Sequence, residues 1–352
     1  MVILFVISLL LLIYSLLIVF LNNALKYLTL SQNLLTPPVS VIVPAHNEQQ
    51  NIRQCIMAIL QQNYPDDLYE IIVVDDHSAD NTYPILLNIR KLYPKVQILK
   101  TQYNLQTHPT GSKKLALTTG IAHASHELLL FTDADCRPPR QWIQSTVSCF
   151  DEHTGFVSGF SPLVHPGHSL FGKLIEFDSL AAATYAAGGI SRNFPITCTG
   201  RNLAYRKSAF NQVSGFTDIM KSISGDDDLL MHLISQRTNW KLKYNISPDS
   251  VVPSIQAKTL RQLITQKQRH ISTGKHFPIS VKLFYMIIHL TNIGCYLFLG
   301  FSLITGSNQL LATSLLLTKI FLNYIFLRSG AIIFKMTHLL KYFLLWEIFS
   351  LF

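Results

Sequence analysis

The sequence predicts an α/β domain, Rossmann-like with a mostly parallel sheet, flanked by transmembrane helices. Over residues 39–135, short runs rich in Val, Ile and Leu alternate with helical segments, the pattern of βαβ units. Apolar residues concentrate at both ends of the 352-residue chain and leave an ordinary middle. Three of the short runs end in polar or acidic residues, and ligands of open α/β sheets bind at the carboxyl edge. A ligand site beside a membrane is therefore the first expectation.

The composition supports this division of the chain. It is 49% hydrophobic and 14% charged, too apolar for a wholly soluble enzyme and too polar for a bundle of membrane helices alone. The formal net charge is +9, and much of it lies between Lys258 and Lys282. A basic segment beside apolar helices usually faces the cytoplasm and anionic lipid. Nucleic-acid binding is the competing interpretation of basic charge. We expect no nucleic-acid partner, because the membrane segments account for the charge.

The N-terminus is predicted to be an uncleaved anchor over residues 1–25. Residues 2–21 are uncharged, and roughly 20 residues at about 1.5 Å each cross a bilayer core of about 30 Å. The segment lacks the basic start and clear cleavage site of a signal peptide. The first basic residue, Lys26, follows it, so the positive-inside rule places what comes next in the cytoplasm. Five cysteines without a CxxC pair suggest reduced cytosolic thiols.

An α/β domain is predicted over residues 38–257, after a linker that contains Pro37 and Pro38. The predicted strands cover residues 39–44, 70–76, 96–99 and 128–133. The predicted helices cover residues 48–62, a segment that Ser78 or Asp80 caps, and residues 111–124. Right-handed crossovers put the strand ends along one edge. That edge then holds Pro44, Asp75, Asp76, Asp133 and Asp135.

The second half of the chain is less regular. Residues 137–257 give a mixed pattern, with a helix from about Asp226 to Gln236. Residues 258–278 resemble a basic amphipathic interfacial segment. Residues 281–352 are predicted to form two or three transmembrane helices. The first two cover 281–304 and 309–327, whereas 331–352 suits a third span, an interfacial helix or a truncated one.

Asp133 and Asp135 are the clearest candidates for cation binding. They follow a buried apolar run, and being two apart on an extended chain they point to the same side. Two such carboxylates suit a hard divalent cation, which also holds phosphate oxygens. An exposed acidic turn is the alternative.

Four polar or acidic sites punctuate the chain. Each alone is explained by helix capping, since Asn, Asp and Glu are favoured at helix N-termini. Three of them close strands of one predicted sheet, which capping alone does not produce. The four are Pro44–Glu48, Asp75–Asp76, Asp133–Asp135 and Gly225–Asp228.

The set resembles the family 2 glycosyltransferases with the GT-A fold, of the membrane-bound type with a Gln-x-x-Arg-Trp-like motif. The resemblance covers roughly residues 38–275. It rests on Val41-Ile42-Val43-Pro44-Ala45-His46-Asn47-Glu48, Ile72-Val73-Val74-Asp75-Asp76-His77-Ser78, Gly111-Ser112-Lys113-Lys114-Leu115-Ala116-Leu117, Phe131-Thr132-Asp133-Ala134-Asp135, Gly225-Asp226-Asp227-Asp228-Leu229 and Gln266-Lys267-Gln268-Arg269-His270.

The resemblance implies a donor site for a nucleotide sugar. Asp133 and Asp135 would hold Mn²⁺ or Mg²⁺ against the donor diphosphate. Asp75 or Asp76 would accept a hydrogen bond from the base, usually uracil, so a UDP-sugar is expected. The remaining residues implied at the donor are Pro44, Ala45, Asn47, Glu48, Lys113, Gln266 and Arg269.

The resemblance also implies a general base and an acceptor side. The base falls within Asp226-Asp227; Asp227 is favoured, and Asp226 takes the role if the alignment slides by one. Three adjacent aspartates favour raised pKa values, which suit a base near neutral pH. Arg201, Asn202 and His270 would lie on the acceptor side, His270 standing where the family motif has Trp.

The implied function is that of a membrane-bound inverting hexosyltransferase of cell-envelope glycan or glycolipid synthesis. It would use a cytosolic nucleotide sugar and a lipid or polysaccharide acceptor, as a multi-pass protein of the inner or plasma membrane with its catalytic domain in the cytoplasm. A processive polysaccharide synthase, a catalytically inactive scaffold and a nucleotidyltransferase are the alternatives.

Overall fold

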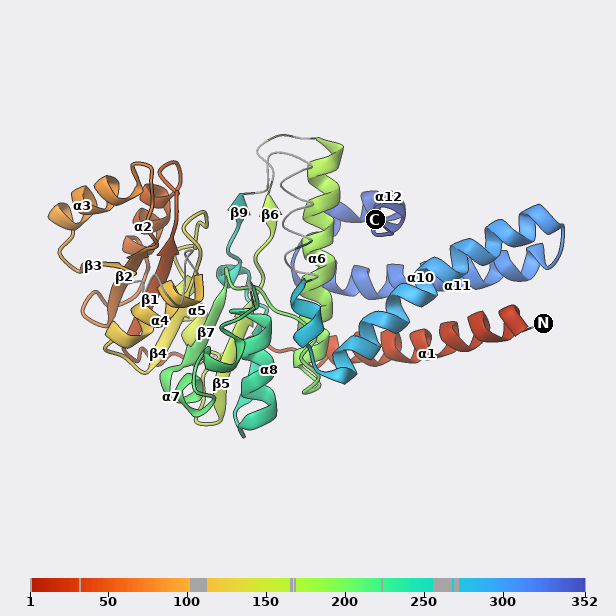
Figure 1. The fold of residues 1–352 in the computed structure, drawn as a ribbon, viewed down its shortest axis with the longest axis horizontal. Helices are drawn as coiled ribbons and strands as arrows, with labels where there is room; N and C mark the ends of the chain where they lie inside the picture. The colour runs from red at the N-terminus through yellow and green to blue at the C-terminus, as the bar shows by residue number, and fades with distance from the viewer. Residues whose placement is uncertain are drawn as a thin grey trace. The chain divides into compact units, whose positions relative to one another are not determined.

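A computed structural model describes most of the chain (Figure 1). The described residues are 2–31, 33–101, 113–164, 167, 169–222, 224–255, 268 and 272–351. The chain forms two compact units. One, here called the sheet unit, comprises Thr29–Gly167 and Thr197–His276. The other, the helical unit, comprises Met1–Leu28, His168–Ile196 and Phe277–Phe352.

A seven-stranded sheet organises the sheet unit, with the strand order β3-β2-β1-β4-β7-β5-β8 (Figure 1). The first four strands along the chain are parallel to one another, as predicted. β7 runs antiparallel to both β4 and β5, and β8 pairs parallel with β5. The strands are β1 (Val39–Ala45), β2 (Tyr69–Asp75), β3 (Val96–Lys100), β4 (Leu128–Phe131), β5 (Thr154–Gly159), β7 (Leu203–Arg206) and β8 (Lys241–Asn245). Two short strands, β6 (Leu163–Val164) and β9 (Ser254–Ile255), form a separate pair.

The core of the sheet unit lies between the sheet and its helices. β1, β2 and β4 are buried almost throughout, which explains their nearly continuous apolar sequences. Ile56 of α2 and Trp142 of α5 belong to the apolar cluster built on these strands. The helices of this unit are α2 (Ile52–Leu60), α3 (Thr82–Leu92), α4 (Lys113–His123), α5 (Trp142–Val147), α7 (Lys207–Gln212) and α8 (Asp228–Arg237), with the 3₁₀ turns η1 (Thr217–Ile219), η2 (Pro248–Ser250) and η3 (Gly274–His276).

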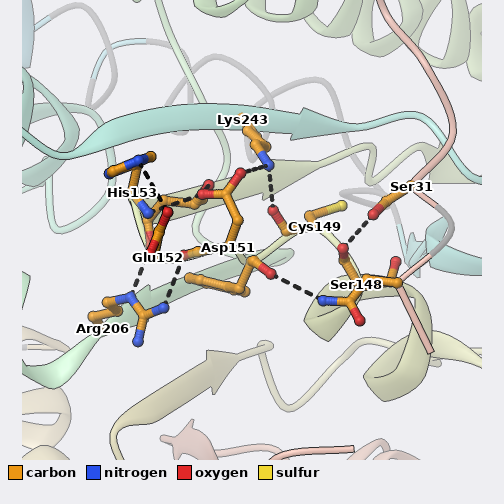
Figure 2. Close-up of polar contacts among 11 residues, drawn as sticks. Ser31, Ser148, Cys149, Asp151, Glu152, His153, Arg206 and Lys243 are labelled. Carbon is orange, nitrogen blue, oxygen red and sulfur yellow. Dashed lines mark hydrogen bonds and ion pairs between the residues drawn. The ribbon is translucent and has the colours of Figure 1, made fainter. Parts of the chain in front are cut away.

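A polar network fixes the turn between α5 and β5 (Figure 2). Lys243 Nζ lies 2.7 Å from Asp151 Oδ2 and donates to the Cys149 carbonyl oxygen at 2.9 Å. Arg206 donates to the carbonyl oxygens of Asp151 and Thr154, each at 2.9 Å. Burial alone would raise the pKa of Asp151, but hydrogen bonds from Lys243 and Thr154 outweigh it and hold that pKa well below its usual range. The network ties β5, β7 and β8 together at the edge where β5 begins.

Three long helices of the helical unit, α1 (Val2–Leu25), α10 (Ile279–Thr305) and α11 (Gln309–Ile333), pack against one another (Figure 1). All three are long and apolar enough to cross a membrane, and they contain the three segments predicted as spans. The C-terminal segment instead forms the 3₁₀ turn η4 (Thr337–Tyr342) and α12 (Phe343–Phe349). Seven residues of helix are about 10 Å long, far short of a bilayer core of about 30 Å. The described part of 331–352 thus contains no further helix that is long enough to cross a bilayer core by itself.

The sequence did not indicate α6 (Leu170–Ile190), which falls in the stretch of mixed pattern and belongs to the helical unit. This helix packs against α1, α11 and α12. A Cβ on Gly330 would lie 2.0 Å from Thr184 Oγ1, so α11 approaches α6 closely only because it has glycine there. The Ala- and Gly-rich stretch of α6 is thus a surface for close helix packing.

A buried polar cluster joins three helices of this unit. Lys319 of α11 pairs with Glu347 of α12, and the side chains are 0% and 1% exposed. Asn323 Nδ2 donates to Glu347 Oε2 at 3.0 Å, and the Tyr14 hydroxyl of α1 donates to Asn323 Oδ1. The two polar residues that interrupt the apolar run 309–327 therefore have partners, as buried charges require.

All five cysteines are free, consistent with the expectation of reduced thiols.

Candidate active site

The strand pairing brings the predicted acidic residues to one edge of the sheet. Ala45 at the end of β1 pairs with Asp75 at the end of β2, and the Asp76 amide donates to the Ala45 carbonyl oxygen at 2.8 Å. β4 lies on the other side of β1 and ends at Phe131, just before Asp133. The carboxyl ends of these three parallel strands therefore meet as the sequence predicted.

The loop Pro44–Glu48 is held against the loop after β2. The Asn47 amide donates to Ser78 Oγ at 3.0 Å, and the Ala79 amide donates to Asn47 Oδ1 at 2.8 Å. The Glu48 amide donates to Thr82 Oγ1 at 2.7 Å. Asn47 has a φ of 56°, a left-handed conformation that Asn tolerates better than most residues. These bonds fix the shape of the predicted nucleotide loop, in which Pro44 is half-buried and Ala45 buried.

Asp75 and Asp76 differ in what their side chains contact. Asp75 is 1% exposed, and its Oδ1 has no hydrogen-bond partner among the described residues. Asp76 Oδ1 accepts from Thr101 Oγ1 at 2.8 Å and lies 3.9 Å from His77 Nδ1. A buried carboxylate oxygen in a native protein has a hydrogen-bond donor. The Asp75 oxygen thus differs from the Asp76 oxygen, which already accepts a hydrogen bond from Thr101.

Lys113 links two of the acidic sites. It begins α4, and its ammonium lies 2.8 Å from Asp133 Oδ1 and 3.2 Å from Asp226 Oδ2. Burial would lower the pKa of Lys113, but the three carboxylates Asp133, Asp226 and Asp227 outweigh it and raise that pKa. Burial would likewise raise the pKa of Asp226, yet the Lys113 charge and hydrogen bond hold it below its usual value.

Asp133 and Asp135, predicted as a carboxylate pair on an extended chain, follow β4 in a turn, in which the Cys136 amide donates to the Asp133 carbonyl oxygen at 3.0 Å. Burial, followed by the charge of Asp133, raises the pKa of Asp135, as expected for two close carboxylates. Asp135 Oδ2 accepts from Ser254 Oγ at 3.0 Å. Burial raises the pKa of Glu48, to which both aspartates add. No group of three or more His, Cys, Asp or Glu in the described ranges has metal-site geometry. Two carboxylates fit a cation that takes its other oxygens from a diphosphate and water.

The acidic run Asp226–Asp228 opens α8. Asp227 caps the helix: its Oδ1 accepts from the Asp228 amide and its Oδ2 from the Gly200 amide, each at 2.8 Å. Asp228 Oδ1 accepts from the Cys198 amide at 2.7 Å and from Thr197 Oγ1 at 3.0 Å. Burial, with Asp227 next to it, raises the pKa of Asp228 well above its usual value. Asp228 thus braces the loop before β7, whereas Asp226 and Asp227 lie by Lys113.

Two of the three residues expected on the acceptor side, Arg201 and Asn202, are described, and their contacts differ. Arg201 is half-buried, donates to the Ser161 carbonyl oxygen at 3.2 Å, and its charge acts on Asp135. Asn202 is 2% exposed, and its side chain is fully engaged. It accepts from Trp142 Nε1 at 2.9 Å and donates to the Phe160 and Ser250 carbonyl oxygens at 2.9 and 2.8 Å. This geometry suits Asn202 for holding loops together. Gln266, Arg269 and His270 lie outside the described residues.

Two further residues shape the site without a predicted role. Lys114 is 2% exposed and donates to the Ser222 and Ser224 carbonyl oxygens at 2.5 and 2.8 Å, which anchors the chain just before Asp226. Gly200 leaves space for charged groups: a Cβ there would lie 3.1 Å from Lys113 Nζ. In the sequence, only the position of Lys114 beside Lys113 and of Gly200 beside Arg201 indicated that these two residues belong to the site.

The chain is similar in sequence and fold to known glycosyltransferases. The model of "Glycosyl transferase family 2" matches residues 40–214, and that of "Glycosyl transferase family group 2" matches residues 130–350. A probable glycosyltransferase of Bacillus subtilis, YdaM, is 30% identical over 200 residues, 56% of this chain and 46% of YdaM. A beta-monoglucosyldiacylglycerol synthase of Synechocystis is 29% identical over 118 residues, 34% of this chain and 24% of the synthase. The chain thus matches less than half the length of either relative.

A solved structure covers the whole fold. The mannosyltransferase PcManGT from Pyrobaculum calidifontis, solved in complex with GDP-Man and Mn²⁺, has a TM-score of 0.61 and 19% identity, with 99% of each chain covered. This likeness confirms the predicted fold class, and the family models confirm the predicted family. The chain belongs to glycosyltransferase family 2 and has the GT-A fold.

Proposed function

We propose that this chain is a membrane-bound inverting glycosyltransferase. It moves a hexosyl group from a cytosolic nucleotide sugar, a UDP-sugar in the first instance, to a lipid or glycan acceptor of the cell envelope. The observation that carries the proposal is the order of groups along one sheet edge. Asp75 ends β2, the Pro44–Glu48 loop follows β1, and Asp133 follows the adjacent β4. This order matches the base, ribose and diphosphate of a nucleotide in turn.

The donor is held by groups of different chemistry. Asp75 Oδ1 accepts a hydrogen bond from the base, and the loop Pro44–Glu48 lines the nucleoside. Lys113 donates to the diphosphate, with Gln266 and Arg269 as further donor-binding residues. Asp133 and Asp135 hold Mn²⁺ or Mg²⁺. When bound there, the cation would supply Lewis-acid neutralisation of the negative charge on the diphosphate.

The acceptor is activated by a carboxylate at the start of α8. Asp227 takes the proton of the acceptor hydroxyl as that oxygen attacks the sugar. Its two backbone hydrogen bonds fix the carboxylate in direction, which general-base catalysis requires. Asp226 keeps Lys113 near the diphosphate through its 3.2 Å contact. We assign Arg201 and His270 to the acceptor side, which Asn202 would support from within the core through its hydrogen bonds to Trp142 and to two backbone carbonyl oxygens.

The three apolar helices support placing this reaction at a membrane. The proposed arrangement is a multi-pass protein of the plasma or inner membrane whose sheet unit faces the cytoplasm. A lipid or lipid-linked acceptor then reaches the site from the bilayer. The name of the Synechocystis relative, a lipid glucosyltransferase, is consistent with this class of acceptor.

A donor panel tests the proposal. Purified protein in lipid nanodiscs is incubated with UDP- and GDP-sugars, GDP-mannose included, with Mn²⁺ and with an excess of chelator. We expect release of a nucleoside diphosphate from one donor, with Mn²⁺ only. Release of pyrophosphate would instead identify a nucleotidyltransferase. Absence of turnover with every donor and with extracted membrane lipids would identify an inactive scaffold.

A further inference from the structure

Lys113 holds together three segments of the candidate active site. Its ammonium contacts Asp133 after β4 at 2.8 Å and Asp226 before α8 at 3.2 Å. Gly200, in the loop before β7, faces the same ammonium, since a Cβ there would lie 3.1 Å from Nζ. The Lys113 ammonium thus neutralises both Asp133, a proposed metal ligand, and Asp226, a member of the proposed general-base pair.

An ammonium and a divalent cation compete for the same carboxylate oxygen. A metal–oxygen bond of about 2.0–2.6 Å to Asp133 would put two positive charges within a few ångströms of each other. At such separations the repulsion is large in a partly buried site. The ammonium therefore has to leave Asp133 before the cation binds tightly.

We propose that Lys113 is a displaceable counter-ion that makes divalent-cation binding depend on the nucleoside diphosphate. The inference rests on the proposed function and adds to it the order in which the diphosphate and the cation bind. Without a diphosphate, Lys113 occupies Asp133 and keeps cation affinity low. The diphosphate draws the ammonium onto its own oxygens, which frees Asp133 for the cation. Donor and cation then bind cooperatively, and by linkage each strengthens the other to the same extent.

The surroundings of Lys113 permit this movement. Its side chain is 36% exposed, and the lysine stem is long and flexible. Asp226 Oδ2 provides a second anchor, so the ammonium can swing away from Asp133 without losing every partner. Asp226 is in turn 11% exposed, which keeps the anchor in place. Lys114, by contrast, is 2% exposed and bound to two backbone carbonyl oxygens, which makes it a fixed structural lysine.

A purely structural ion pair is the competing account. It predicts that removing the Lys113 charge loosens the site and weakens cation binding with or without nucleotide. The counter-ion account predicts that removing the Lys113 charge raises the nucleotide-free affinity for the cation and reduces the gain that the diphosphate gives. The sign of the change in nucleotide-free cation affinity therefore distinguishes the two accounts.

The test measures Mn²⁺ binding by electron paramagnetic resonance on the full-length protein in nanodiscs, with and without UDP or GDP. The variants are Lys113→Gln, Lys113→Met and Lys113→Arg. Lys95→Gln is the matched control, because Lys95 also pairs with an aspartate, Asp66. Lys95 lies just before β3, at the edge of the sheet opposite to the candidate active site. Circular dichroism and thermal unfolding check that each variant is folded.

Wild type should bind Mn²⁺ weakly alone and about tenfold or more tighter with the nucleoside diphosphate, in the usual range of coupling between sites. The neutral variants should bind Mn²⁺ about tenfold tighter than wild type without nucleotide, and the diphosphate should strengthen Mn²⁺ binding less than it does in wild type. Lys113→Arg and Lys95→Gln should behave like wild type. Unchanged or weaker nucleotide-free Mn²⁺ binding in both folded neutral variants would overturn the inference.

The outcome is separable from that of the proposed function. If the donor panel yields a nucleoside diphosphate but the neutral variants bind Mn²⁺ no tighter, the counter-ion role fails and glycosyl transfer stands. If no donor is turned over and Mn²⁺ binds neither alone nor with nucleotide, both fail.

Discussion

The backbone amide of Gly200 donates a 2.8 Å hydrogen bond to Asp227 Oδ2. The bond joins the loop before β7 to the first residues of α8, two segments separated by 27 positions in the chain. A side chain at position 200 would enter the space next to Lys113 and the two aspartates. Gly200 therefore orients the general-base candidate Asp227 through its backbone amide, and its lack of a side chain leaves room for the neighbouring charged groups.

Gly200→Ala should lower kcat about tenfold while leaving the fold intact. The added Cβ would lie 3.1 Å from Lys113 Nζ and 3.3 Å from Asp226 Oδ2, so these flexible ends shift by a few tenths of an ångström. Small displacements of positioned groups cost much rate and little stability. Steady-state kinetics and thermal unfolding check this. The control is Gly300→Ala, whose Cβ meets nothing within 4 Å. Equal kinetics for the two variants would contradict the role of Gly200.

Asp227→Asn should reduce kcat by about 10²–10⁴-fold, the usual contribution of a general base. Donor binding should persist, because the proposed donor groups lie on other residues and the Asn oxygen can still accept from one of the two backbone amides that Asp227 binds. Asp226→Asn should cost at least tenfold less, since it removes only an anchor of Lys113. Turnover and donor affinity of both variants are the measurements. A larger loss of kcat for Asp226→Asn would assign the base to Asp226 instead.

Lys319→Met should destabilise the helical unit by about 3–5 kcal/mol, because it leaves Glu347 as an uncompensated buried charge. The double variant Lys319→Met/Glu347→Leu should recover most of that loss, since two apolar side chains replace the pair. Unfolding in a mild detergent, followed by tryptophan fluorescence, measures both. Additive losses in the double variant would show that the two residues do not act as a pair.

His232 should make stability depend on pH. Burial lowers its pKa to about 4 from a usual value of 6.5, so the unfolded chain binds the proton more readily. As the pH falls from about 6.5 to about 4, wild type should therefore lose about 3 kcal/mol of stability relative to His232→Gln. Unfolding by denaturant across this range gives the difference. A wild-type stability that, relative to His232→Gln, stays constant or rises as the pH falls would contradict the buried neutral imidazole.

The parallel half of the sheet and its acidic edge could be predicted from the sequence, because each strand is a short apolar run followed at once by polar residues. The apolar runs that end at Asp75 and Phe131 are buried on both faces, so pattern and burial agree. The antiparallel β7 and the helix α6 left no such signal. β7 is only four residues long, and α6 mixes Glu176 and Asp178 with alanines because its partners are other helices of its unit.

Within the site, the sequence predicted which residues gather there. It did not predict which contacts each side chain makes. Asp75 and Asp76 are equivalent in sequence, yet the Thr101 hydroxyl, which follows β3, donates to the backbone carbonyl oxygen of Asp75 and to the side-chain carboxylate of Asp76. Asn202 sits in a motif expected near the acceptor, whereas Trp142 and two distant carbonyl groups engage its side chain. Such contacts join positions 25 to 60 residues apart, which spacing along the chain does not encode.

Asp135 is the residue that we propose to hold the cation on the donor diphosphate. The direct measurement is Mn²⁺-dependent release of nucleoside diphosphate by Asp135→Asn in nanodiscs. Asp218→Asn serves as the control, because Asp218 is a half-exposed carboxylate that pairs with Arg237. We expect Asp135→Asn to lose metal-dependent turnover with an unchanged unfolding temperature, and Asp218→Asn to keep it. Metal-dependent turnover retained at the wild-type level by Asp135→Asn would contradict the account.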